Sequence, residues 1–410
     1  MPNKELMSRL GGWKGYRSGA VDRFEAGVKG PRAEVWIDLL AVGDQPRKCS
    51  GCGHFVRRVH DWTEREVRDL PLFDADTVLM VSRARVACPR CGPKLEALDW
   101  LEPHARVTKR LAANVARLCK VMPIKWVADH YGLHWGTVKA IDKAHLMREL
   151  EAVDLRRVKL LLMDEFAIHK GHRYATVVTD AERKHVLWVG KGRSREDVRP
   201  FFEWLGKARC QRIQAVGMDM WLAFESEVRR HCPQAEIVYD QFHVVASFGK
   251  EVIDKVRTDE ARRVKSDKAA QELIKGAKWL LLGNWENLPD RKTKVRLNEL
   301  LDANQSLMTV YVLKDALKAL WGYIHEGWAR KAWENWLEMA QSSGLKPLME
   351  FARKLTRRID GILSHCRWPL NTSVLEGMNN KIKVLKRIAY GYRDEAYFFL
   401  KIRAAFPGIP

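Results

Sequence analysis

Three acidic residues have the types and positions needed for metal-dependent phosphoryl transfer. Asp164 lies in RVKLLLMDEFAIH, Asp219 in IQAVGMDMWLAF and Glu376 in NTSVLEGMNNKIK. Each aspartate ends a short apolar run that predicts a strand, and the glutamate lies on a basic helical pattern. Oxygen ligands suit Mg²⁺ or Mn²⁺, and two such ions can hold the attacking and leaving oxygens of an in-line displacement. The three residues are therefore candidate metal ligands, although acidic residues in such places can also be solvated or capping groups.

Two cysteine motifs, Cys49-Ser-Gly-Cys52 and Cys88-Pro-Arg-Cys91, predict a zinc site. Each motif is a tight turn with glycine or proline beside it, so two such turns can supply four thiolates to one Zn²⁺. Four protein ligands leave no open position for substrate or water, and the zinc is therefore expected to be structural. A redox pair or free buried thiols are the alternatives, but the βαβ context of a redox motif is missing.

The strand-like residues 64–73 and 76–88 lie between the two cysteine motifs and predict a ribbon. The remaining cysteines have no partner spacing and are predicted to be small buried residues: Cys119, Cys210, Cys232 and Cys366.

A helix-turn-helix is predicted after the ribbon. A helical pattern covers residues 107–122, Pro123 can open the next helix, and Gly132 lies where a turn between helices needs a positive φ. The following helix would enter the DNA major groove. Candidate contacts near its exposed amino-terminal end are His134, Trp135, Thr137 and Lys139. An ordinary helical hairpin is the alternative, and Trp126 and Trp135 favour core packing over base stacking.

From about residue 155 short β-branched runs alternate with amphipathic helices. The order of three strands, helix, strand, helix and strand is typical of a ribonuclease-H-like core, in which the first and fourth strands are central neighbours. Asp164 and Asp219 would then lie side by side, as a two-metal site requires. Glu165 should point to the opposite face of its strand and is the second choice for the first ligand.

Residues 245–368 are almost wholly helical in pattern and interrupt this core as an inserted subdomain. Its tryptophans are expected to pack the helices together, although rings beside Arg and Lys can also stack on unpaired bases. These tryptophans are Trp279, Trp321, Trp328, Trp333 and Trp336.

After this stretch, Glu376 opens a helix on which Asn379, Asn380 and Lys383 share its face. The carboxylate would hold a metal, the amides a nearby phosphate, and the lysines the DNA backbone. Lys386 and Arg387 extend this basic face, or are simply solvated on an ordinary surface helix.

The charge balance favours a polyanionic partner. The 410 residues include 72 Lys and Arg against 51 Asp and Glu, which gives a net charge of +21 and a pI near 9.7. No membrane-spanning segment or signal peptide is evident, so no membrane partner is predicted and the protein is expected in the cytoplasm, where cysteines stay reduced.

The chain resembles the insertion-sequence transposases of the ISL3 family, a branch of the DDE transposases. The resemblance covers about residues 8–404 and rests on the paired CxxC turns followed by VHDWTEREVRDLPL, on MDEFAIHKGHRYATVVTD, GMDMW and AEIVYDQFHVV, and on SVLEGMNNKIKVLKRIAYGYRDEAYFFLKI. It implies that Asp164, Asp219 and Glu376 hold catalytic Mg²⁺ or Mn²⁺. Asp240 and His243 resemble a D-x-x-H element and are implied to support the site, with a buried Asp–His hydrogen bond as the alternative.

The resemblance also implies a function and an organisation. The protein would bind the terminal inverted repeats of a mobile element on double-stranded DNA, cleave a strand, and join it to target DNA. Synapsis of two ends predicts at least a homodimer on DNA, in a prokaryotic nucleoid. A structure-selective nuclease or resolvase, or a non-catalytic DNA-binding regulator, remains the alternative.

The expected fold is multidomain α+β. The predicted domains are a zinc ribbon over residues 1–100, a helix-turn-helix over 101–152, a ribonuclease-H-like α/β core with a mixed sheet over 153–244 and 369–410, and an all-α insertion over 245–368.

Overall fold

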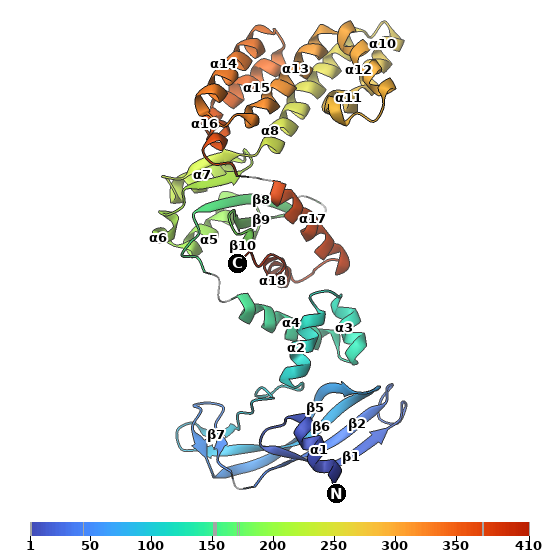
Figure 1. Ribbon diagram of the computed structural model, residues 1–410, viewed down its shortest axis with the longest axis vertical. Coiled ribbons are helices and arrows are strands. Elements are labelled where there is room, and N and C mark those ends of the chain that lie inside the picture. The colour runs from blue at the N-terminus through green and yellow to red at the C-terminus, as the bar shows by residue number, and fades with distance from the viewer. Residues whose placement is uncertain are drawn as a thin grey trace. The chain divides into compact units, whose positions relative to one another are not determined.

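The computed structural model describes residues 2–43, 45–150, 154–169, 171, 173–370 and 373–409. The chain forms two compact units (Figure 1). The first contains residues 1–152 and 386–400, and the second contains residues 153–385 and 401–410. The predicted division into domains stays a prediction.

The first unit is built on a twisted sheet of five strands in the order β1-β2-β6-β5, with β7 paired to β6. Its elements are α1 (Pro2–Gly11), β1 (Tyr16–Phe24), β2 (Glu34–Ala41), β5 (Val59–Leu72), β6 (Ala75–Cys88) and β7 (Gly92–Leu95), and a separate small ladder joins β3 (Arg47–Lys48) to β4 (Phe55–Val56). The two long strands β5 and β6 form the predicted antiparallel ribbon. Alternate residues of β2 and β6, such as Ile37, Leu79 and Val81, face a buried core with Trp13.

Three helices follow in the same unit: α2 (Lys109–Leu118), α3 (Ile124–Tyr131) and α4 (Trp135–Leu150). Thr108 caps α2 by accepting a hydrogen bond from the Leu111 backbone. Gly132 ends α3 with a φ of +58°, a left-handed conformation that glycine adopts without strain. Leu111, Val115, Val127 and Val138 bury the helices against one another. The predicted helix-turn-helix geometry is therefore confirmed.

The second unit contains a mixed sheet in the order β10-β9-β8-β11-β12. The strands are β8 (Leu160–His169), β9 (Arg173–Asp180), β10 (His185–Lys191), β11 (Ala215–Met218) and β12 (Glu236–Tyr239). The first three form an antiparallel meander, whereas β11 runs parallel to both β8 and β12. The first and fourth strands of this sheet are therefore neighbours, as the sequence predicted.

Helices cover both faces of this sheet. Between the strands lie α5 (Arg195–Leu205), α6 (Lys207–Cys210) and α7 (Leu222–His231). Phe201 and Phe202 of α5 and Phe224 of α7 join Leu161 and Met163 of β8 in one core. The opposite face meets α17 (Ser373–Ile388), where the Thr179 hydroxyl donates to the Met378 sulfur at 3.7 Å. The chain continues into α18 (Glu395–Ala405).

A wholly helical region connects β12 to α17 (Figure 1). Its elements are α8 (Gln241–Phe248), a π-helical turn (Gly249–Ile253), α9 (Asp254–Arg263), α10 (Lys268–Gly276), α11 (Lys278–Leu282), a 3₁₀ turn (Trp285–Asn287), α12 (Arg291–Ala303), α13 (Gln305–Ala319), a 3₁₀ turn (Leu320–Gly322), α14 (Glu326–Ser342), α15 (Lys346–Thr356), α16 (Ile359–Leu363) and a 3₁₀ turn (Ser364–Cys366). Its core is continuous with that of the sheet.

The predicted packing role of the tryptophans is correct for some of them and wrong for others. Trp333 and Trp336 are buried and stack on each other, and Trp321 is half-buried against the same core. Trp279 and Trp328 are instead 77% and 64% exposed. Neighbouring Lys and Arg keep the surface hydrophilic, so helical periodicity alone does not tell which tryptophans are covered.

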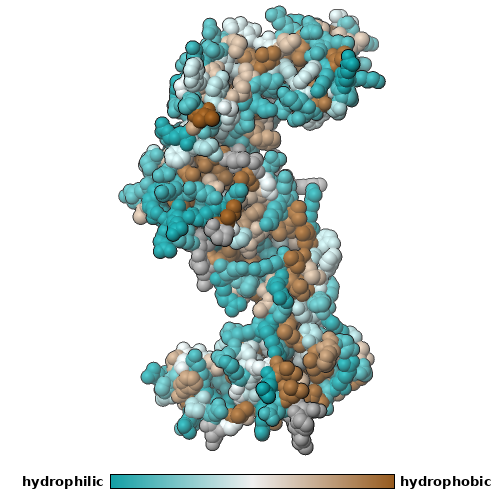
Figure 2. Space-filling model, viewed as in Figure 1, coloured by the Kyte–Doolittle hydropathy of each residue, from teal (hydrophilic) through white to brown (hydrophobic). Residues whose placement is uncertain are grey.

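The visible face of the molecule is mostly hydrophilic, with apolar residues scattered over it (Figure 2). None of the helices in the described part of the chain combines the length and the apolar character needed to cross a membrane.

Candidate functional site

Asp164 lies in the middle of β8, where that strand continues past the end of its parallel neighbour. The last β8–β11 pair is Leu162 with Gly217, so Asp164 stands two residues beyond it. The expectation that Asp164 ends a strand is therefore wrong, because β8 stays paired with β9 on its other side. Asp164 nevertheless lies where the parallel pairing opens, and its side chain is 7% exposed.

Asp219 directly follows β11. Extending the register by two residues places it beside Asp164. Its Oδ1 accepts a hydrogen bond from the backbone N–H of Trp221 at 2.9 Å, which fixes the carboxylate at the strand end. The predicted neighbourhood of the two aspartates is consistent with this register.

Helix α17 brings two further side chains to Asp164. Glu376 lies in its first turn and is exposed. One turn later, the Asn379 amide donates to Asp164 Oδ2 at 2.7 Å. The prediction gave Asn379 a phosphate as its partner, but in the structure its amide nitrogen orients a carboxylate.

Asp240 and His243 lie at the start of α8. Asp240 caps this helix by accepting from the Phe242 backbone N–H at 2.8 Å, and its Oδ2 lies 3.7 Å from His243 Nε2. Together with Asp164 and α17 they surround a cavity of about 410 Å³. The cavity is lined by Asp164, Glu165, Asp240, Gln241, Phe242, His243, Leu375, Glu376, Asn379, Asn380 and Lys383.

Glu165 is also among the residues that line this cavity. Its Oε1 accepts from Arg193 Nη1 at 3.0 Å, whereas its Oε2 is buried without a hydrogen-bond partner among the described residues.

Burial and mutual repulsion disfavour the simultaneous ionisation of these carboxyl groups. Burial raises the pKa of Asp164 to about 6, although the Glu165 backbone N–H and the charge of His243 act against the rise. Burial, and after it the charge of Glu165, raise the pKa of Asp219 to about 7, and Asp164 adds to the effect. The site therefore carries excess negative charge that a divalent cation would neutralise.

This electrostatic penalty predicts a pH-dependent gain in stability for Asp219→Asn. A carboxyl group whose pKa is raised by folding destabilises the fold increasingly from about pH 4, its unfolded value, to about pH 7, its folded value. Because its neighbours titrate with it, we expect the variant to be more stable by about 1–2 kcal/mol at pH 8.

Urea unfolding of zinc-loaded protein in Mg²⁺- and Mn²⁺-free buffer measures this gain. The difference from wild type should be small at pH 4, where the carboxyl group is protonated in the folded state and about half protonated in the unfolded state. A variant that is less stable than wild type by the same amount at pH 8 and at pH 4 would contradict the expected burial penalty.

The donor set fits Mg²⁺ or Mn²⁺. Asp164, Asp219 and Glu376 offer only carboxylate oxygens, and these ions use one or two carboxylates together with waters and substrate phosphates. The three carboxylates do not form a closed cage within the described chain, where the four cysteines are the one group of ligand atoms lying within 4.8 Å of one another. An open arrangement leaves space for phosphate oxygens.

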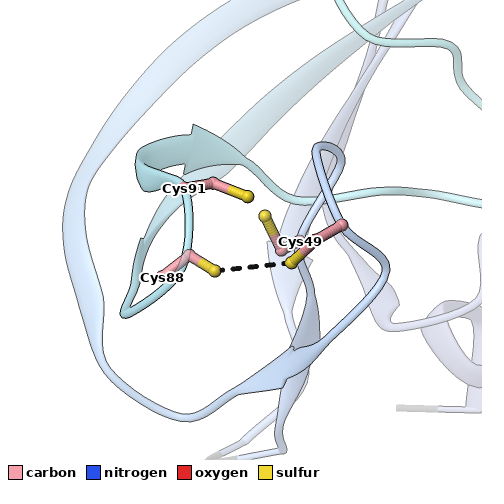
Figure 3. Close-up of side chains that lie close together, drawn as sticks. Cys49, Cys88 and Cys91 are labelled. Atoms are coloured by element: carbon pink, nitrogen blue, oxygen red, sulfur yellow. Dashed lines mark hydrogen bonds between the residues drawn. The ribbon is translucent and has the colours of Figure 1, made fainter.

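The four predicted thiols do converge at the end of the ribbon. Cys49, Cys88 and Cys91 turn their sulfurs toward one another (Figure 3), and Cys52 Sγ lies 3.6 Å from Cys88 Sγ. The first turn packs closely against the second, since a Cβ at Gly51 would lie 3.2 Å from Cys91 Sγ. A hydrogen bond with Cys52 raises the pKa of Cys91 to about 12, since the thiols share protons at close range. Tetrahedral zinc would replace these protons.

The other four cysteines were predicted to be buried, and this is correct for three of them. Cys119, Cys210 and Cys232 are buried, and Cys366 is half-buried.

The candidate DNA contacts on α4 differ in accessibility. His134 and Thr137 are exposed, and Trp135 is 54% exposed, as is Trp126. The expectation that the two tryptophans pack in the core is therefore wrong. Lys139 is half-buried, and its Nζ pairs with Asp394 at 2.9 Å, which holds the pKa of Asp394 well below its usual range.

The basic residues of α17 follow the predicted helical face. Asn380 and Lys383 are exposed and lie together at the cavity, where Lys383 Nζ donates to Asn380 Oδ1 at 3.3 Å. Arg387 is exposed and Lys386 is half-buried, and both belong to the first unit.

Models of known protein families match successive regions of the chain. A family model described as a transposase matches residues 161–402. A model of the helix-turn-helix domain of transposase family ISL3 matches residues 96–146, and a model of the zinc finger of transposase IS204/IS1001/IS1096/IS1165 matches residues 45–91.

Two relatives illustrate the similarity. The chain is 52% identical over 409 residues to the transposase for insertion sequence element IS1001 of Bordetella parapertussis, across 100% of this chain and 99% of that protein. It is 28% identical over 407 residues to the transposase for insertion sequence element IS1557 of Mycobacterium tuberculosis H37Rv, across 90% of this chain and 88% of that protein.

Proposed function

Because the chain belongs to the ISL3 family of transposases, we propose that it cuts DNA at the ends of an insertion sequence and joins those ends to target DNA. Two observations support this proposal: Asp164 and Glu376 line one cavity, and the register between β8 and β11 puts Asp219 beside Asp164.

The proposal includes a ribonuclease-H-like core. An antiparallel meander, two parallel strands and helices on both faces support that assignment, and the helical region between β12 and α17 would be an insertion into it. The helical insertion then separates the second catalytic carboxylate from the third in sequence.

Asp164, Asp219 and Glu376 would hold Mg²⁺ or Mn²⁺, which would supply a nucleophilic water for cleavage and an activated 3′-hydroxyl for joining. Asn379 orients Asp164 through its amide. Lys383 brings positive charge to the same cavity, where it would offset the charge of a bound phosphodiester, and His243 lines the cavity beside it. Asp240 positions the first turn of α8, on which His243 lies.

The first unit would recognise the terminal inverted repeats. Structural zinc at Cys49, Cys52, Cys88 and Cys91 would hold the ribbon, and the exposed amino-terminal turn of α4 would enter the major groove. Basic side chains would fix the register on the phosphates, consistent with the net charge of +21. Synapsis of two ends would require a homodimer on DNA, working in the bacterial cytoplasm.

Strand joining is the decisive test. A labelled duplex that ends in the element's inverted repeat is incubated with protein, target DNA and Mg²⁺ or Mn²⁺. We expect metal-dependent nicks at the repeat boundary, followed by products covalently joined to target DNA.

Two other outcomes contradict the proposal. Cleavage without joining identifies a structure-selective nuclease, whereas binding of the repeat without any metal-dependent cleavage identifies a DNA-binding regulator. A duplex with a scrambled repeat is the matched control, since it carries the same phosphates without the same sequence.

A further inference from the structure

The loop between β10 and α5 is anchored beside the carboxylate cavity. Gly192 has a φ of +83°, and its N–H donates to the Tyr174 carbonyl at 2.8 Å. Ser194 and Asp197 then form a capping box at the start of α5. A Cβ on Gly192 would lie only 2.0 Å from Asp197 Oδ2. These contacts hold the backbone of Arg193 in one conformation.

The Arg193 side chain lies between two aromatic rings and pairs with a residue of the cavity. Its guanidinium carbon is 4.0 Å from the ring centroid of Tyr174 and 4.4 Å from that of Trp221. Its Nη1 donates to Glu165 Oε1 at 3.0 Å. Both rings attract the cation, and their flat faces match the planar guanidinium, which a lysine ammonium would not do.

Trp221 links Arg193 to Asp219. The indole N–H of Trp221 donates to the Arg193 carbonyl at 2.9 Å, and the Trp221 backbone N–H donates to Asp219 Oδ1 at 2.9 Å. Glu165, the other partner of Arg193, directly follows Asp164 on β8. Arg193 therefore contacts a neighbour of each aspartate, one on either side of the opening between β8 and β11.

We propose that Arg193 is a positioning residue that sets the affinity of the carboxylate site for divalent cations. It fixes the segments that carry Asp164 and Asp219 relative to each other, through its contacts with Glu165 on one side and Trp221 on the other. The inference rests on the proposed metal-dependent function and adds a residue to it. Partners of metal ligands typically change metal affinity or activity by about 10–100-fold when removed.

An ion pair of the neighbouring helix α5 provides a matched control. Arg199 pairs with Glu227 at 3.2 Å and its side chain is 33% exposed, against 31% for Arg193. The Arg199 pair joins α5 to α7 and contacts neither aspartate. A loss that is specific to Arg193 therefore reports on the carboxylate site, because removal of either arginine breaks an ion pair and the two arginines are similarly exposed.

The test is a Mn²⁺ titration of thermal stability, using the full chain with zinc in its cysteine site and no DNA. We expect Arg193→Ala to raise the Mn²⁺ concentration for half-maximal stabilisation by about tenfold. Arg193→Lys, which keeps the charge but not the planar stacking, should give an intermediate shift, and Arg199→Ala should match wild type. Affinity for the repeat duplex should be unchanged in all variants.

The inference fails if Arg193→Ala and wild type respond equally to Mn²⁺, or if Arg199→Ala shifts the response as much. It also fails if Mn²⁺ does not stabilise the wild-type chain. If Arg193→Ala does not fold, Arg193→Lys decides the question by itself. Failure of the proposed function is seen separately, as the absence of cleaved and joined DNA from a wild-type chain that does bind Mn²⁺.

Discussion

Asp219→Asn is expected to lower the rate of DNA cleavage by at least about 10³-fold while leaving binding of the repeat duplex intact. The amide keeps the size of the side chain and loses the negative charge that would hold a cation beside Asp164. Strand joining should fall with cleavage, because both steps would use the same carboxylates. Asp164→Asn and Glu376→Gln should behave in the same way. Single-turnover cleavage of a pre-bound, labelled duplex measures the effect.

Asp180→Asn is the matched control for loss of a buried carboxylate. Asp180 lies on the same sheet and is 1% exposed, but it pairs with Arg183 at the other end of β9. Its replacement should change stability and not the rate of cleavage by bound protein. Cleavage by Asp219→Asn at more than a tenth of the wild-type rate would remove Asp219 from the proposed metal site.

Cysteine in place of Asp219 separates a metal ligand from a residue that only shapes the cavity. A thiolate is a poor ligand for Mg²⁺ and a better one for softer ions. The Asp219→Cys variant should therefore be inactive with Mg²⁺ and partly active with Mn²⁺. Equal loss with both ions would argue for a role in shape alone.

Loss of the cysteine site should unfold the end of the ribbon and abolish recognition of the repeat. Apparent zinc-binding free energies of structural sites are about 10–16 kcal/mol, comparable to the whole stability of a small domain. Cys88→Ala is expected to abolish the binding of one zinc per chain and to lower repeat affinity by at least about 100-fold. Atomic absorption and a duplex-binding titration measure the two effects.

Cys119→Ala is the matched control for this prediction, because Cys88 and Cys119 are both 3% exposed and both belong to the first unit. It should keep its zinc and its affinity for the repeat. Zinc bound at full stoichiometry by Cys88→Ala would contradict the assignment of the four thiols as one site.

Local patterns predicted those parts of the molecule that depend on local spacing. The two CxxC turns, the long hairpin between them, Gly132 between two helices and the strand order of the mixed sheet were all visible in the sequence and are present in the structure. Each follows from a short-range rule about turns, periodicity or ligand geometry. The three carboxylates were also candidates because of local patterns: each aspartate ends an apolar run, and the glutamate lies on a basic helical pattern.

Contacts between distant segments could not be predicted in this way. Asn379 reaches Asp164, and Lys139 pairs with Asp394, across more than two hundred residues in each case. Glu165 was visible in the sequence beside Asp164, but no sequence signal marks Arg193 as its partner.

Strand β6 belongs both to the five-stranded sheet and to the proposed zinc site, which limits how the protein can be engineered. This strand, Ala75–Cys88, pairs with β2 through its first part, with β5 along nearly its whole length and with β7 at its end, and it finishes on a cysteine of the proposed zinc site. The zinc-finger match over residues 45–91 therefore includes a central strand of a larger sheet. Exchange of residues 45–91 between relatives would therefore replace this interior strand of the sheet without two of its partners, β2 and β7. To change which inverted repeat is bound, an exchange must transfer the whole five-stranded sheet. New DNA specificities should arise more readily through point substitutions.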